Sequence, residues 1–245
     1  MTFSRWQAAG NEYLVVERAT PADALTPAAV RAEVGSADGI LEVVEARGDE
    51  VEIVIWNPDG STAEMSGNGT RIAACWLAER TGADLVRVRV GPRVVTTRIG
   101  DDGEAEQDLG QVEVFERERI AGLEVTPVSV GNPHAVVLGD PDDLPLIGPL
   151  LEAHPRFPQR TNVQVARVDR PGVVTARVWE RGVGETASSG TSAVAVAAAT
   201  HGEGTVVVRF PGGDLRVRIE AGHAFLAGPA RRVACDDRCD IGTIP

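Results

Sequence analysis

The chain has 245 residues, of which 43% are apolar, and this is enough for one large domain or two small ones. Its formal net charge of −12 and sequence pI near 4.8 argue against nucleic acid or an anionic membrane as a partner, because both bind basic patches. The composition also excludes a disordered or fibrous protein.

The first residues and the cysteines indicate where the protein works. The opening MTFSRWQAAGNEYLVVE has no basic stretch followed by an apolar core, so we expect no signal peptide. The longest apolar run, 193–199, is too short to cross a bilayer. Cys75, Cys235 and Cys239 are odd in number and indicate a reducing cytoplasm. We expect Cys235 and Cys239 to be surface thiols, since no His or second Cys pair lies nearby to complete a metal site.

The first half of the chain predicts strands around one helix. Alternating, valine-rich segments predict strands at 50–56, 85–90 and 93–99. The Ala-rich segment 69–80 contains no proline and predicts a helix. The charged segment 115–125, FERERIAGLEV, is interpreted as a hinge.

The second half follows the same plan. We predict strands at 173–179, 205–210 and 214–220, the last two joined by Pro-Gly-Gly, which is a hairpin signal. Segment 190–201 predicts a second helix, and because it is apolar nearly all round we expect it to be buried.

Two sequence motifs each occur twice, in the same order in both halves of the chain. GNEYLVVE (10–17) is repeated as GNPHAVVL (131–138), 121 positions later. A Trp stands ten residues before a Ser in Trp56–Ser66 and again in Trp179–Ser189, 123 positions later. The repeat predicts a duplicated α+β domain, residues 1–117 and 118–245, each a curved sheet around a central helix.

Ser66 and Ser189 each stand where a loop becomes a helix. The small residues after them let a ligand approach the unpaired N–H groups of the first turn, which attract a carboxylate. Plain helix capping is the alternative for a single copy, but two matched copies favour a site. Two groups facing one carbon can remove a proton from one face and supply one to the other, which inverts a stereocentre without a cofactor. His134 and Glu180 are candidates to assist them, against the alternatives of a turn histidine and a surface glutamate.

The chain resembles the diaminopimelate epimerase family across nearly its whole length. The segments that carry the resemblance are QAAGNEYLVVE, WNPDGSTAEMSGNGTR, GNPHAVV, FPQRTNV and ERGVGETASSGTSA. It implies two barrel-like domains related by pseudo-twofold symmetry, with the active site between them. It also implies a cytoplasmic homodimer that interconverts LL- and meso-diaminopimelate, for lysine and peptidoglycan synthesis, without pyridoxal phosphate or metal.

The resemblance also implies roles for individual residues. Ser66 and Ser189 fall where the family has its two catalytic cysteines, and His134 and Glu180 match the residues that assist them. The positions that match substrate-binding residues are Asn11, Asn57, Gly67, Asn68, Asn132, Asn162, Arg181, Gly190 and Thr191.

Serine at both cysteine positions is the main departure from the family. A thiol ionises far more readily than an alcohol, so we expect slow catalysis or none. Three interpretations stay open: an engineered pair of Cys→Ser changes, a natural enzyme that relays protons through His134 and Glu180, or an amino-acid-binding homologue that has lost the reaction. Ser192, where the family usually has Gly, favours a natural variant. The shortened segment 30–43 leaves open a different amino acid as substrate.

Three rival motifs are weaker. GVGETA (182–187) could be a dinucleotide fingerprint, but the parallel βαβ pattern is missing. SGNGT lacks the Lys of a phosphate-binding loop, and a Ser66–His134 hydrolase would need a Gly-x-Ser-x-Gly elbow.

Overall fold

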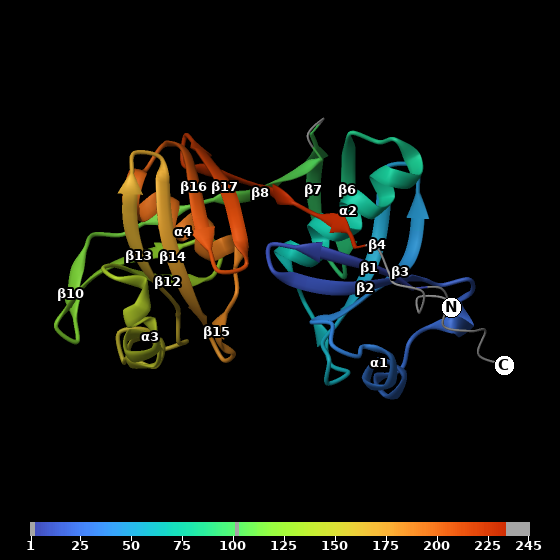
Figure 1. Cartoon of the computed structure of the whole chain (residues 1–245), viewed down its shortest axis with the longest axis horizontal. Coiled ribbons are helices and arrows are strands. Elements are labelled where there is room, and N and C mark those ends of the chain that lie inside the picture. Colours follow the sequence, from blue (N-terminus) through green and yellow to red (C-terminus); the bar gives the residue numbers. More distant parts are fainter. Residues whose placement is uncertain (1–2, 101–102, 234–245) are drawn as a thin grey trace. The chain divides into compact units, whose positions relative to one another are not determined.

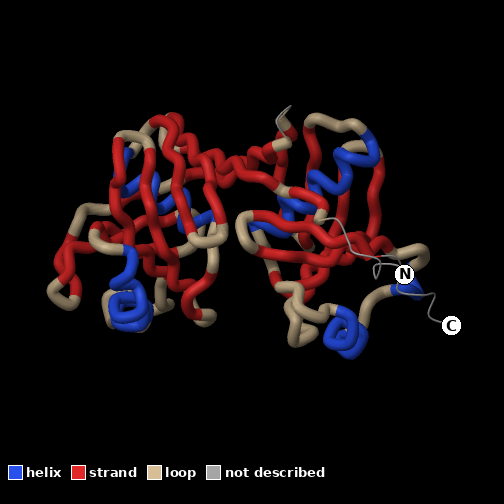
Figure 2. Tube along the Cα trace, in the orientation of Figure 1, coloured by secondary structure: helices blue, strands red, loops and turns tan. Residues whose placement is uncertain are grey.

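The computed structural model describes residues 3–100 and 103–233, which form two compact units (Figures 1 and 2). The first unit runs to Gln107 and resumes at Pro229, and the second spans Asp108–Gly228. The chain leaves the first unit within strand β8 (Glu104–Gln111) and returns within β18 (His223–Pro229). Cys235 and Cys239 lie outside the described residues.

The boundary predicted at 117 and 118 lies inside the second unit instead. The segment interpreted as a hinge, 115–125, contains β10 (Glu118–Ile120) and the start of β11 (Leu123–Ser129), which pair as a hairpin. Its charged residues are exposed or partly exposed, on β10, on β11 and just before β10, and Ile120 and Val125 are buried among them. Charge density alone therefore misplaced the hinge.

The first unit is a mixed sheet in which neighbouring strands run in the order β19-β1-β2-β3-β4-β6-β7-β8. All these pairs are antiparallel except β2–β3 and β4–β6. In chain order its elements are β1 (Phe3–Ala8), β2 (Asn11–Glu17), the 3-10 helix η1 (Pro21–Asp23), α1 (Pro27–Glu33), β3 (Gly39–Arg47), β4 (Glu50–Trp56), β5 (Thr62–Ala63), α2 (Gly67–Thr81), β6 (Leu85–Val90), β7 (Arg93–Ile99), β8 and β19 (Arg231–Arg232).

The second unit repeats this arrangement, with neighbours in the order β11-β12-β13-β14-β16-β17-β18 and parallel pairs at β12–β13 and β14–β16. A short strand β9 (Glu113–Val114) and β10 both pair with β11. The remaining elements are β12 (Pro133–Leu138), η2 (Pro141–Asp143), α3 (Leu144–Glu152), β13 (Asn162–Arg170), β14 (Val173–Glu180), β15 (Gly184–Thr186), α4 (Gly190–His201), β16 (Gly204–Phe210) and β17 (Gly213–Glu220).

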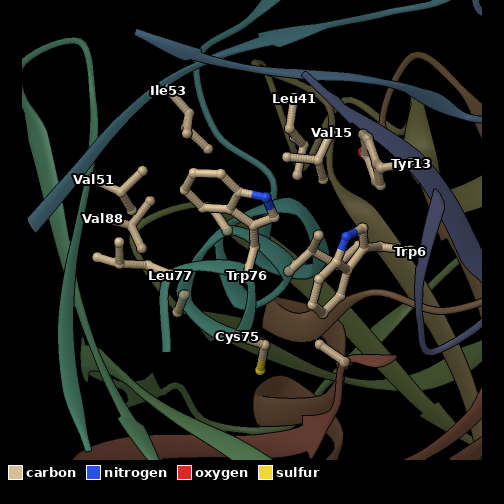
Figure 3. Close-up of a cluster of buried hydrophobic side chains, with 14 of the residues drawn as sticks. Trp6, Tyr13, Val15, Leu41, Val51, Ile53, Cys75, Trp76, Leu77 and Val88 are labelled. Atoms are coloured by element: carbon tan, nitrogen blue, oxygen red, sulfur yellow. The ribbon is translucent and has the colours of Figure 1, made fainter. Parts of the chain in front are cut away.

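Each sheet curves around one helix, so the predicted α+β fold is confirmed. Helix α2 packs against β1, β2, β3, β4, β6, β7 and β19, and α4 packs against β11, β12, β13, β14, β16 and β17. In the first unit Trp76 of α2 lies among Leu41, Val51 and Ile53 of the strands (Figure 3). In the second, residues 192–198 of α4 are all buried, and they are small enough to let the sheet close tightly around them.

Most predicted elements have the expected bounds. Helix α4 and strands β4, β6 and β7 begin and end at the predicted residues. Helix α2 begins at Gly67, two residues earlier than predicted, because Ser66 caps it. Helices α1 and α3 were not predicted, since each begins with a proline in its first turn and α3 also contains Pro149. No helix of the described part has the length and apolar character needed to span a membrane.

Candidate active site

Ser66 ends a loop and caps the first turn of α2. Its backbone is extended, with φ −144° and ψ 117°, and its Oγ accepts a 3.0 Å hydrogen bond from the N–H of Gly69. A Cβ on Gly69 would lie 3.2 Å from this Oγ, so glycine allows the close approach. A Cβ on Gly67 would meet nothing within 4 Å. The open space beside Gly67 leaves room for a ligand at this first turn, and the N–H groups of a helix N-terminus attract anions.

Strand β2 fixes the beginning of α2 through two side chains. The Tyr13 hydroxyl lies 3.1 Å from Ser66 Oγ, and the Tyr13 ring is buried in the core around α2. Asn11, at the start of the same strand, accepts a 2.5 Å hydrogen bond on Oδ1 from Nδ2 of Asn68. The strand thus holds both the capping residue and the second residue of the helix.

Arg71 places a buried positive charge beside this first turn. Its Nη2 donates to Oδ1 of Asn68, and its Nε and Nη1 have no hydrogen-bond partner within the described part of the chain. Burial lowers the pKa of Arg71 to about 10, against an opposing effect of Cys75, so the guanidinium is still protonated at neutral pH. A buried charge of this sign adds to the attraction of the helix N-terminus for an anion.

Ser189 has the corresponding place before α4. Its backbone is again extended, with φ −150° and ψ 130°, but its side chain caps no backbone N–H. The residue is only 9% exposed. A Cβ on Gly190 would lie 2.7 Å from Cδ2 of Leu226, so this first turn is more crowded than that of α2. The two serines therefore share a position but differ in their immediate contacts.

An amide side chain meets the second helical residue in both units. Nδ2 of Asn132 donates to Oγ1 of Thr191 over 3.5 Å, as Asn68 bonds to Asn11 in the first unit. Asn132 follows Asn11 by 121 positions, and Thr191 follows Asn68 by 123. The sequence repeat therefore corresponds to a repeated contact between a strand and a helix.

His134 is a buried, neutral histidine. Its Nε2 lies 2.9 Å from Oδ1 of Asn132, and its Nδ1 lies 3.0 Å from Nε2 of Gln164, so the ring proton is assigned to Nε2. Burial lowers the pKa of His134 to about 3; the hydrogen bond from Gln164 opposes this, and the charge of Arg181 adds to it. Among the described residues amides occupy both ring nitrogens, and no hydrogen bond joins the ring to Ser189.

The remaining candidates of the second unit lie at the end of β14, in the loop after it and at the start of β13. Oε1 of Glu180 accepts a 2.6 Å hydrogen bond from Oγ1 of Thr186. The N–H of Arg181 donates to Oδ1 of Asn162 over 3.0 Å, and Nδ2 of Asn162 donates to the carbonyl of Pro133 over 3.0 Å. Asn162 thus joins the loop of Arg181 to the strand that carries His134.

The duplication pairs residues of different chemistry. Tyr13 and His134 stand at matching positions 121 apart, and Asn57 and Glu180 at matching positions 123 apart. Asn57 belongs to the loop that follows β4, and its Nδ2 donates to Oγ of Ser61 in the same loop over 2.9 Å. The first unit therefore has a phenol and an amide where the second has an imidazole and a carboxylate. Sequence reasoning missed Tyr13, although the alignment of GNEY with GNPH places it opposite His134.

Buried glutamates anchor the repeated tryptophans ahead of both serine loops. Nε1 of Trp56 donates to Glu42 over 2.8 Å, and Nε1 of Trp179 donates to Glu152 over 2.7 Å. Burial alone would raise the pKa of Glu42, but hydrogen bonds from Arg18, a backbone N–H and Trp56 hold it below its usual value. Neither glutamate could be recognised from the repeat, because one comes from β3 and the other from α3.

One pocket of the second unit lies beside the candidates Asn132 and His134. It has a volume of about 440 Å³, and its lining includes Phe115, Asn132, His134, Arg156 and Arg160. A larger pocket of about 700 Å³ in the first unit is lined by residues such as Phe3, Trp76 and Arg80 and contains no predicted site residue. Among the described residues no three His, Cys, Asp or Glu side chains gather as metal ligands would.

Each unit thus brings together its own share of the predicted residues. In the first unit these are Asn11, Ser66, Gly67 and Asn68, with Asn57 on the loop that follows β4. In the second unit two groups form, one of Asn132, His134, Ser189, Gly190 and Thr191, and one of Asn162, Glu180 and Arg181.

Comparison with known proteins gives a consistent result. The family model described as "Diaminopimelate epimerase" matches residues 3–115 and 126–233. The chain is 36% identical over 270 residues to a diaminopimelate epimerase of Synechococcus elongatus, covering 95% of this chain and 96% of the relative. It is 37% identical over 274 residues to one from Desulforudis audaxviator, covering 95% and 97%.

Solved structures share the fold at lower identity. A hydroxyproline epimerase from Agrobacterium vitis with bound trans-4-hydroxy-L-proline is similar with a TM-score of 0.66 and 16% identity, covering 96% of this chain and 91% of that one. A predicted epimerase from Pseudomonas aeruginosa gives a TM-score of 0.69 and 17% identity, covering 95% and 97%. The family match over both units and the high coverage of its relatives show that this chain belongs to the diaminopimelate epimerase family.

Proposed function

We propose that this chain binds diaminopimelate and interconverts its LL and meso forms by moving a proton at one α-carbon. The observation that supports the proposal is the duplicated helix start, in which Ser66 and Ser189 immediately precede α2 and α4 in a chain of this family. In each unit an Asn side chain bonds to the second residue of the helix. These two helix starts supply the donors that a carboxylate needs.

In the proposed reaction each serine serves one face of the α-carbon. One serine, which has first lost its hydroxyl proton to solvent, accepts the proton from the carbon on its alkoxide oxygen, and the electron pair of the C–H bond stays on the substrate, next to its carboxylate. The other serine gives its hydroxyl proton to the opposite face of the same carbon, so the centre inverts and no proton is lost. The helix N-termini and buried Arg71 stabilise the additional negative charge on the substrate.

The acidity of serine sets the speed of this reaction. An alcohol is a much weaker acid than a thiol, so an alkoxide at Ser66 or Ser189 is costly to form at neutral pH. Burial keeps His134 neutral, and its pKa of about 3 makes it a poor final acceptor for the proton. We therefore expect turnover that is slow compared with a variant carrying cysteine at both positions.

A second function is favoured by the same serines. A protein with the helix N-termini intact but no thiolate would bind the amino acid without turning it over. Turnover of a different amino acid is a third candidate function, since the segment 30–43 is shorter than usual for the family.

The test is uptake of solvent deuterium at the α-carbons of LL- and meso-diaminopimelate, followed by NMR in heavy water. The chain as given is compared with Ser66→Cys/Ser189→Cys and with Ser66→Ala/Ser189→Ala. We expect slow uptake by the chain, faster uptake by the double cysteine variant and none by the double alanine variant.

The outcomes separate the three candidate functions. Uptake only by the double cysteine variant means that the substrate is right and the serines bind without turnover. Equal uptake by the chain and the double alanine variant would remove the serines from the mechanism. Uptake by none, together with no saturable binding of diaminopimelate, would reject this substrate.

Three further proposals rest on the family resemblance. They are a homodimer, a cytoplasmic location and a place in lysine and peptidoglycan biosynthesis. Light scattering coupled to size-exclusion chromatography would test the first, with the mass of one chain as the contradicting result.

A further inference from the structure

We propose that Tyr13 is a positioning residue, whose hydroxyl donates a hydrogen bond to Ser66 Oγ and stabilises the negative charge that forms there when Ser66 gives up its proton. This inference rests on the proposed function of Ser66. It adds a residue that the family pattern did not supply, and it gives the first unit a counterpart to His134 of the second.

An N–H donor and a hydroxyl that can donate converge on the oxygen of Ser66. The N–H of Gly69 donates to it over 3.0 Å, and the oxygen of Tyr13 lies 3.1 Å away. When Tyr13 is the donor in this pair, Ser66 accepts both bonds and its own proton is left for the substrate. Two donors at a helix N-terminus form the arrangement that stabilises an oxyanion.

The surrounding structure holds the phenol in this place. Tyr13 is 9% exposed and belongs to the core cluster around α2, where Figure 3 shows its ring close to Val15 and Leu41. Strand β2 pairs Tyr13 with Gly39 of β3, and a Cβ at Gly39 would lie 2.8 Å from the ring. The glycine therefore provides the space that the ring occupies, and the hydroxyl needs little reorganisation to serve Ser66.

The proton balance defines what Tyr13 does. When Ser66 acts as the acid, its O–H bond breaks, the proton forms the new C–H bond, and the electron pair stays on Oγ. The hydrogen bonds from Tyr13 and Gly69 strengthen as this charge develops. When Ser66 acts as the base the same steps run in reverse, and Tyr13 keeps its proton throughout.

The second unit lacks this arrangement at Ser189. Ser189 caps no backbone N–H, and the ring of His134, at the position matching Tyr13, is held by the amides of Asn132 and Gln164. Of the two serines Ser66 and Ser189, Ser66 is therefore the one that has, among the described residues, a hydroxyl from its own unit within hydrogen-bond distance.

The first experiment labels tyrosine, and because Tyr13 is the one tyrosine of the chain the label reports on Tyr13 alone. Incorporation of tyrosine labelled with ¹³C at Cζ gives one NMR resonance that reports on the phenol. We expect Ser66→Ala to shift this resonance and Thr81→Val, a hydroxyl removal at the other end of α2, to leave it in place. An unchanged resonance in Ser66→Ala would overturn the proposal, whether or not the chain has activity.

The second experiment measures exchange of the α-proton of diaminopimelate. Tyr13→Phe keeps the ring and removes the hydroxyl, and we expect kcat to fall about 10- to 100-fold with KM changed less than about twofold. Thr81→Val should leave both unchanged. With Ser66→Cys/Ser189→Cys as the parent, the Tyr13→Phe loss should shrink to about threefold or less, because a thiolate needs less stabilisation.

The outcomes distinguish this proposal from the proposed function. If Tyr13→Phe raises KM without lowering kcat, the tyrosine is purely structural. The same conclusion follows if Tyr13→Phe lowers kcat equally in the serine and cysteine parents. Absence of exchange in both parents would reject the proposed function, and the NMR comparison of Ser66→Ala with Thr81→Val would still decide whether Tyr13 donates to Ser66.

Discussion

Lowering the pH should destabilise the protein through His134. The folded structure lowers the pKa of this buried ring to about 3, whereas an unfolded histidine has its ordinary value of 6.5. The unfolded chain therefore binds the proton first as the pH falls. The stability associated with the neutral ring is fully present above about pH 6.5. This stability is lost as the pH falls from about 6.5 towards about 3.

The size of the effect follows from these two pKa values. Between about pH 7.5 and about pH 5 the linkage relation gives a loss of about 2 kcal/mol from this one group. About pH 5 is a suitable lower limit, because most Asp and Glu side chains are still ionised there.

Urea unfolding of the chain and of His134→Gln at these two pH values measures the effect. Glutamine keeps a polar side chain among the amides but cannot titrate, so the loss between the two pH values should be about 2 kcal/mol smaller in the variant. His154→Gln, at a half-buried loop histidine, is the matched control for replacing a histidine by glutamine. An equal pH dependence in His134→Gln and the parent would refute a buried, neutral His134.

Other predictions concern packing and thiol reactivity. Gly39→Ala should lower the free energy of unfolding by about 2 kcal/mol or more, because its Cβ would lie 2.4 Å from a main-chain oxygen. Gly67→Ala, where a Cβ meets nothing within 4 Å, should leave stability nearly unchanged while weakening diaminopimelate binding in a calorimetric titration; unaltered binding would contradict an anion site there. Burial raises the pKa of the Cys75 thiol to about 11, so in a Cys235→Ser/Cys239→Ser variant it should resist maleimide at about pH 8 until urea is added. Rapid labelling of the native variant would contradict this placement.

Much of the fold could be predicted because local patterns agree with tertiary packing. Alternating valines mark β6, valine and threonine mark β7, and an apolar run of small residues marks α4. Helices α1 and α3 could not be recognised, since prolines in their first turns read equally well as loops. The crossing between units was misplaced because it occurs inside a strand, β8, rather than in the charged segment 115–125.

The site could be predicted only as far as residues that the repeat or the family pattern marks. The helix starts at Ser66 and Ser189 follow from the repeat. The contact of the Tyr13 hydroxyl joins it to Ser66, far along the chain, and the burial of Arg71 depends on the strands that pack around α2. The neutral state of His134 likewise follows from its burial, which tertiary packing produces.

The central claim is that two different serines serve the two faces of one carbon. The most direct measurement follows LL-diaminopimelate in heavy water during the first few per cent of conversion, using the chain as given, or Ser66→Cys/Ser189→Cys if that variant is the faster. If two groups act, new meso product carries solvent deuterium while the remaining LL substrate keeps its hydrogen. Protium retained in the meso product, or deuterium appearing equally in the recovered LL substrate, would show that one group serves both faces.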